Sequence, residues 1–133
     1  MTNGMNLWGR DFSLPVYYEC DSDQDVLEIQ KEAKDTLLAS WDTVEDSKEA
    51  IEDYCLERDG DQIESPITNI FRYVIPTSIV ALRSDDARKA ALMCNYRFDP
   101  EHGLAAVFEN EKLTAVVPQD GLWSSHKQPE NKN

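Results

Sequence analysis

The amino-acid sequence predicts an α+β fold, in which an antiparallel sheet made of a C-terminal meander and an N-terminal strand carries two or three helices on one face. In the C-terminal third, apolar residues alternate with smaller or polar ones, a period of two that is typical of strands with one buried face. In residues 23–59, apolar residues recur every three or four positions, as in amphipathic helices. The chain has 133 residues, so we expect one domain over residues 1–123 and a polar, disordered tail over residues 124–133.

The N-terminal strand is predicted within residues 6–20. Four large apolar residues recur there at period two: Phe12, Leu14, Val16 and Tyr18. This spacing is typical of an extended segment, and Pro15 within it favours an edge strand or a bulge.

Three helices are predicted after this strand. The first covers residues 23–40, where an apolar stripe at helical spacing consists of Val26, Ile29, Ala33 and Leu37. The second begins at Asp42 or Thr43 and ends at Asp59-Gly60, and its buried side consists of Val44, Ile51 and either Tyr54 or Cys55. Ser65-Pro66 predicts a short third helix that stops before Pro76, because serine caps helices and proline suits their first position.

Four further strands are predicted over residues 78–82, 91–98, 104–109 and 112–117. Asn110-Glu111 joins the last two at hairpin length, and asparagine tolerates the left-handed conformation that a tight turn needs. Because short connections join strands that lie side by side, we expect these four to form an antiparallel meander.

The net charge of −13 is concentrated in one third of the chain. Residues 19–64 hold 17 acids and 4 bases, whereas the other 87 residues hold 9 of each. Nucleic-acid-binding proteins need a basic surface, and anionic membranes repel acidic proteins, so we expect neither as a partner. No apolar run approaches the roughly 18 residues of a membrane span, and the N-terminus lacks a signal-peptide pattern, so we expect a cytoplasmic protein. The surplus of acids suits a basic protein partner.

No cofactor or metal motif is found in the sequence. The five glycines are dispersed, so no glycine-rich loop is available to cradle a phosphate. Acids at positions 21, 23, 25 and 32 copy the spacing of a calcium-binding loop, but Val26 stands where such a loop needs glycine. The cysteines, Cys20, Cys55 and Cys94, are far apart and are expected to be reduced thiols. We therefore predict neither a metal nor a cofactor.

The segment 99–103 places two carboxylates and an imidazole between two predicted strands, and a Gln-Asp pair follows the last strand. These groups are typical of acid/base chemistry and of metal sites, and the candidate residues are Asp99, Glu101, His102, Gly103, Gln119 and Asp120. The alternative is a purely structural connection, in which Pro100 sets a turn, Gly103 supplies an unusual backbone angle, and Asp99 and His102 bond to nearby backbone groups. The sequence is compatible with both interpretations.

Residues 98–120, FDPEHGLAAVFENEKLTAVVPQD, resemble the signature of a bacterial family of small acidic proteins with a domain of unknown function. In that family an aromatic residue and Asp precede Glu-His-Gly-Leu, and two strands lead to a Gln-Asp pair. Here the pattern begins at Phe98 and ends at Asp120, although Pro118 stands where the family usually has glycine. The resemblance covers residues 12–122 and is specific only in the last block. It implies no established enzyme activity. It implies instead an immunity-type protein, which neutralises a toxin from the same gene cluster.

The leading hypothesis from the sequence is a non-catalytic protein-binding module of immunity or antitoxin type. Acids on the outer faces of the two long helices would steer and orient a basic protein such as a cognate toxin. The expected contact residues are Asp42, Glu45, Asp46, Glu49, Glu52 and Asp53. Two alternatives are a metal-dependent or acid/base site at the Asp99–His102 turn and a homodimeric structural module.

Overall fold

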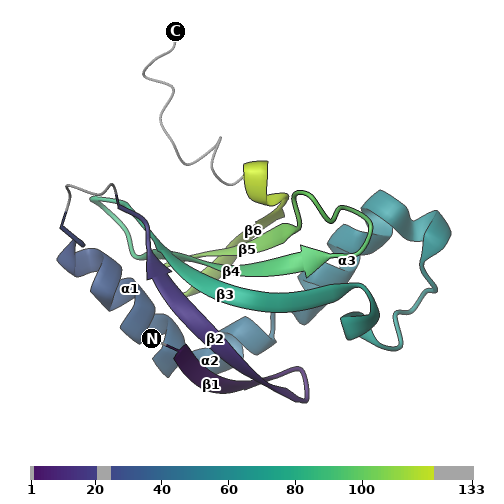
Figure 1. Cartoon of the computed structure of the whole chain (residues 1–133), viewed down its shortest axis with the longest axis horizontal. Helices are drawn as coiled ribbons and strands as arrows, with labels where there is room; N and C mark the ends of the chain where they lie inside the picture. The colour runs from purple at the N-terminus through teal and green to yellow at the C-terminus, as the bar shows by residue number, and fades with distance from the viewer. Residues whose placement is uncertain (1, 21–24, 122–133) are drawn as a thin grey trace, which may run out of the picture.

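The computed structural model describes residues 2–20 and 25–121. Six strands form one sheet in chain order (Figure 1). The strands are β1 (Thr2–Leu7), β2 (Arg10–Tyr18), β3 (Val74–Leu82), β4 (Lys89–Tyr96), β5 (Leu104–Glu109) and β6 (Lys112–Val117). Three helices cover one face: α1 (Glu28–Ala39), α2 (Trp41–Glu45) and α3 (Lys48–Asp59). The predicted α+β class and the predicted meander, β3 to β6, are thereby confirmed.

One strand pair is parallel. β2 pairs with β3 in the same direction, with Val16 opposite Ile79 and Tyr18 opposite Ala81, whereas the other four pairs are antiparallel. Parallel neighbours need a long crossover connection, and the segment that holds α1, α2 and α3 supplies it. Along the chain, the three helices come between β2 and β3. In space, they pack against one face of the sheet that contains these two strands.

The main core lies between that face and the helices. Leu37 of α1, Val44 of α2 and Ile51 of α3 are fully buried, as are the strand residues Ile79 and Leu92. Gln30 is a buried polar residue whose amide nitrogen donates to the carbonyls of two strand-end residues, Glu19 and Ala81, at 2.8 and 3.1 Å. These bonds fix the start of α1 against the ends of β2 and β3, because an unpaired buried amide would be costly.

The N-terminal segment differs from the prediction because it forms two strands rather than one. A tight turn at Trp8-Gly9, with φ of 56° and 88°, joins β1 to β2. The Trp8 indole nitrogen donates to the Glu45 carbonyl at 3.0 Å, and that of Trp41 donates to the Asn6 carbonyl at 2.8 Å. The two tryptophans therefore hold this hairpin against α2.

Two helix predictions are corrected at their ends. The first helix begins at Glu28 rather than at residue 23, because the Gln30 side chain accepts a hydrogen bond from the Leu27 backbone at 2.9 Å and caps the helix there. The predicted second helix is divided into α2 and α3 at the buried residue Ser47, whose hydroxyl donates to the Val44 carbonyl. Serine that bonds to a preceding carbonyl competes with regular helix geometry.

The predicted helix after Ser65-Pro66 is wrong. Only a short 3-10 turn, η2 (Ile70–Arg72), forms there, following another, η1 (Gly60–Gln62). The Asn69 side chain caps η2 by accepting a hydrogen bond from the Phe71 nitrogen at 3.1 Å. The chain enters β3 at Val74, and from there its backbone groups bond to β4 and not to one another in a helix.

One strand prediction is shifted, and two predicted segments lie wholly or partly outside the described residues. The strand predicted over residues 91–98 lies at Lys89–Tyr96, because the chain turns after Tyr96. Among the described residues, no helix is long and apolar enough to cross a membrane. The predicted tail, residues 124–133, and two of the four acids of the calcium-like spacing, at positions 21 and 23, lie outside the described residues.

Candidate functional site

Asp99 organises the connection between β4 and β5. Its carboxylate accepts from the His102 backbone nitrogen at 3.3 Å and lies 3.1 Å from the Nδ1 atom of the same residue. Its backbone carbonyl accepts from the Gly103 nitrogen at 2.8 Å. The predicted bonds from Asp99 to nearby backbone groups are therefore present, and they close a compact turn.

Gly103 is the one position of this turn that admits no side chain. Its φ is +58°, a conformation that residues with a Cβ atom adopt at a cost. A Cβ atom would lie 2.4 Å from the Cys94 carbonyl oxygen and 2.8 Å from the Gln119 Nε2 atom. The space left by the glycine is thus filled by the Gln119 amide.

The Gln119 side chain joins three segments of the sheet. Its Nε2 atom donates to the carbonyls of Cys94 in β4 and Leu104 in β5, at 2.9 and 3.3 Å. Its backbone nitrogen donates to the His102 carbonyl at 3.1 Å. We call this arrangement of Asp99, Gly103 and Gln119 the turn clamp, because it fixes the chain after β6 to the β4–β5 connection.

His102 lies between two carboxylates at the surface. Its Nε2 atom is 3.9 Å from the Asp120 carboxylate, and Arg58 of α3 places a guanidinium nitrogen 3.6 Å from the other oxygen of Asp99. Burial acts to raise the pKa of Asp99, but the His102 hydrogen bonds and the charge of Arg58 outweigh it, so this pKa lies below its ordinary value. Glu101 is exposed and does not join the group.

The turn therefore gathers five of its six predicted residues, with Glu101 left outside. A carboxylate that orients an imidazole is the arrangement of a general base. However, no set of three or more His, Cys, Asp or Glu side chains among the described residues is placed to hold a metal ion. Arg72 and Arg97, and not His102, line two clefts at this end of the sheet.

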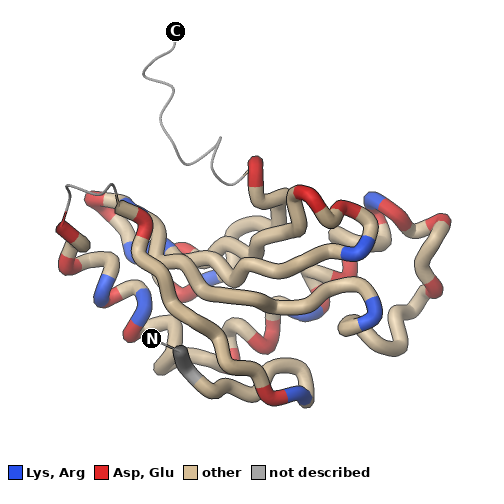
Figure 2. Tube along the Cα trace, viewed as in Figure 1, with Lys and Arg blue, Asp and Glu red and all other residues tan. Residues whose placement is uncertain are grey.

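The six acids predicted as partner contacts follow α2, α3 and their connection (Figure 2). Four of them are exposed and two, Glu45 and Glu52, are half-buried. None forms an ion pair with another residue in the described part of the chain. We call this set the acidic surface: Asp42, Glu45, Asp46, Glu49, Glu52 and Asp53.

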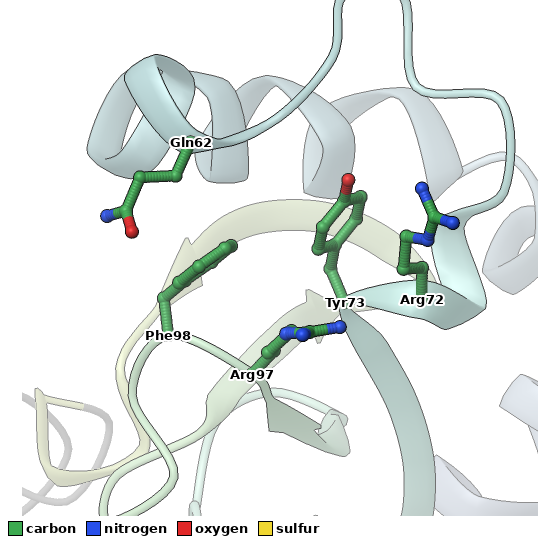
Figure 3. A pocket seen from close by; sticks show the side chains of 5 residues that line it. All are labelled: Gln62, Arg72, Tyr73, Arg97 and Phe98. Atoms are coloured by element: carbon green, nitrogen blue, oxygen red, sulfur yellow. The ribbon is translucent and has the colours of Figure 1, made fainter.

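Sequence reasoning missed a polar cleft at the place where β3 begins and β4 ends. Figure 3 shows the residues that line it: Gln62, Arg72, Tyr73, Arg97 and Phe98. The two arginines flank neighbouring antiparallel strands. Arg72 comes just before β3, and Arg97 comes just after β4. The available signal was this placement, because antiparallel pairing brings the start of one strand to the end of the next.

Comparison with known proteins finds one family. The family model described as "Domain of unknown function (DUF6985)" matches residues 2–123. No curated protein and no solved structure matches the chain. The match confirms the expected likeness to a family with a domain of unknown function.

Proposed function

The chain belongs to the DUF6985 family, and we propose that it is a non-catalytic protein-binding module that captures a basic protein through the acidic surface. The observation that carries the proposal is a set of six carboxylates on α2, α3 and their connection that lack ion-pair partners among the described residues. Lys48 is the only base between Trp41 and Glu57. A surface of one charge steers an oppositely charged partner and sets its orientation.

The acidic surface costs the fold stability, which supports a role outside folding. Glu49 and Asp53 are four residues apart within α3, and Asp46, the C-cap of α2, is four residues after Asp42, so like charges lie next to each other in both places. Such pairs destabilise a helix by about 0.2–0.5 kcal/mol each. A basic partner would remove this repulsion on binding, so part of the cost would return as affinity.

The opposite sides of the same helices are fixed in the core. Val44, Ile51 and Cys55 are fully buried, so α2 and α3 present their acids from a rigid support. A preorganised surface loses less conformational freedom on binding, which favours affinity. Immunity and antitoxin proteins act by binding in this manner, and we propose a basic toxin of the same bacterial cell as the partner. The three free cysteines agree with a reducing, cytoplasmic setting.

In this proposal the turn clamp has a structural role. The Gln119 side chain joins the segment after β6 to β4 and β5, and the Asp99 carboxylate bonds to His102 within the β4–β5 connection. Groups that hold strands together are not free to bind a substrate. We therefore assign the acidic surface, and not the Asp99–His102 turn, to partner binding.

The test is tagged capture from a lysate of the native host, at low and then high salt, followed by identification of the bound protein. One variant reverses four exposed acids of the acidic surface: D42K, D46K, E49K and D53K. The matched control reverses four exposed acids elsewhere: E28K, D61K, D85K and E101K. Both variants change the net charge equally.

We expect a basic protein that is bound by the wild type and the control, and lost by the acidic-surface variant. Loss of capture by both variants alike would show that only net charge matters and would contradict the assignment. Equal capture by all three proteins would contradict it as well. The solution mass of the purified chain, measured by light scattering, tests the homodimer alternative in the same preparation.

A further inference from the structure

The cleft where β3 begins and β4 ends is unusual for this acidic chain, because arginines line it and acids do not. It has a volume of about 350 Å³, and a neighbouring cleft of about 300 Å³ shares Arg72, Tyr73 and Arg97 with it. No Asp or Glu lines either cleft, although the chain as a whole carries a net charge of −13. Two guanidinium groups are thus gathered in a small space on a strongly acidic protein.

Both arginines are held close by the backbone. The Arg97 nitrogen donates to the Tyr73 carbonyl at 2.8 Å, which extends the β3–β4 pairing by one step beyond Val74 and Tyr96. Arg97 therefore lies opposite the residue that follows Arg72. In Figure 3 the Arg97 side chain runs beneath the Tyr73 ring toward Arg72.

Neither of these arginines forms an ion pair within the described part of the chain. Other arginines are engaged: Arg58 faces Asp99, and Arg88 binds Glu111 through two nitrogens at 2.8 and 3.0 Å. Arg72 and Arg97 are both exposed, and both line the two clefts. Exposed guanidinium groups without an ion-pair partner bind oxyanions, because the geometry of their forked N–H donors matches that of carboxylates and phosphates.

The wall beside the arginines is aromatic and rigid. The Tyr73 and Phe98 rings stack with centroids 5.9 Å apart and an angle of 24°. The Tyr73 hydroxyl donates to Glu64, which also accepts from the Thr68 nitrogen and hydroxyl at 3.3 and 3.1 Å. The carboxylate beyond the tyrosine is therefore occupied by its own donors, and Tyr73 is fixed in place as one side of the cleft.

We propose that this cleft binds a small phosphomonoester, with the phosphate between Arg72 and Arg97 and the organic part against Tyr73 and Phe98. A phosphomonoester carries about −1.5 to −2 charges near pH 7, which matches two guanidinium groups, whereas a carboxylate neutralises only one. The exposed Gln62 amide on the opposite side of the opening adds a neutral donor and acceptor. The volume suits a small-molecule site.

The acidic charge of the rest of the chain does not prevent this binding. At physiological ionic strength the Debye length is about 8 Å, so distant carboxylates are largely screened, while the arginines contact the ligand directly. The site is separate from the acidic surface on α2 and α3. Its test is therefore independent of partner capture.

The experiment titrates the purified full chain with phenyl phosphate, inorganic phosphate and benzoate, each followed by calorimetry and by the arginine side-chain NMR signals. We expect phenyl phosphate to bind more tightly than inorganic phosphate, and benzoate to bind at least about tenfold more weakly. R72Q and R97Q should each weaken phenyl phosphate binding by about tenfold or more. R83Q, at the opposite end of β3, is the matched control and should bind as the wild type does.

The conservative variants R72K and R97K keep the charge without the forked donors, so they should bind more weakly than the wild type and more tightly than the glutamine variants. They also serve if a glutamine variant fails to fold. Absence of binding by the wild type at about 10 mM phenyl phosphate, or full affinity in R72Q and R97Q, would overturn the proposal. Benzoate binding as tight as phenyl phosphate would overturn the assignment to a phosphomonoester.

Discussion

Replacing Gly103 by alanine should destabilise the fold by about 3 kcal/mol. A left-handed residue with a Cβ atom costs about 1–2 kcal/mol. The new Cβ would also lie 2.4 Å from the Cys94 carbonyl oxygen and 2.8 Å from Gln119 Nε2, so the Gln119 amide must leave its partners. Loss of a hydrogen bond to a buried carbonyl adds about 1–3 kcal/mol. With a typical urea slope of about 1–3 kcal/mol per molar, the midpoint of unfolding should fall by about 1 M or more.

Two other glycines separate the causes of this loss. Gly9 also has a positive φ, of +88°, but a Cβ there meets nothing within 4 Å, so G9A should show only the conformational cost. Gly60 has a negative φ, of −62°, and open space, so G60A should be nearly neutral. The double variant G103A/Q119A should lose less than the sum of the single variants, because part of the clash is removed. Equal losses in G103A and G9A would refute the turn clamp.

Two other predictions concern titration and thiol reactivity. The hydrogen bond from the Tyr73 hydroxyl is the largest of several, with those from the Glu64 backbone and from Thr68, that lower the pKa of Glu64 from 4.5 to about 2. These bonds stabilise the fold above pH 4.5, and their contribution is lost as the pH falls toward 2. Y73F should therefore be less stable than the wild type at pH 6, and urea unfolding at pH 3 should show a smaller difference; a constant difference would contradict this cause. Cys55 and Cys94 are fully buried, and burial raises the pKa of Cys55 to about 11, whereas Cys20 is half-exposed. An aromatic disulfide reagent should thus modify only Cys20 in the native chain and all three thiols in denaturant; rapid reaction of all three in the native chain would contradict the packing.

The β5–β6 hairpin shows what local sequence predicts well. Both strands have the predicted bounds, and Asn110 and Glu111 have φ of 51° and 66°, as a tight hairpin turn requires. The alternation of side chains and the turn residues are local signals, and here they agree. The buried sides of the helices, including Val44, Ile51 and Cys55, were also predictable from helical spacing.

Pairing between distant segments was not predictable in this way. The parallel contact of β2 with β3 depends on how the helical crossover packs, and the break at Ser47 depends on a serine that is buried among the helices. The bonds from Gln119 to Cys94 and Leu104 join residues that no sequence spacing relates. The arginine cleft was missed because charge was summed along the chain, where residues outside 19–64 have no net charge, rather than in space.

The most direct test of partner binding through the acidic surface is the association rate of the captured basic protein, measured against salt concentration. We predict that this rate rises as salt is lowered for the wild type and for the control variant E28K/D61K/D85K/E101K. In D42K/D46K/E49K/D53K it should fall by about tenfold or more, and the salt dependence should disappear or reverse. An association rate that is the same for all three proteins at every salt concentration would contradict the proposed function.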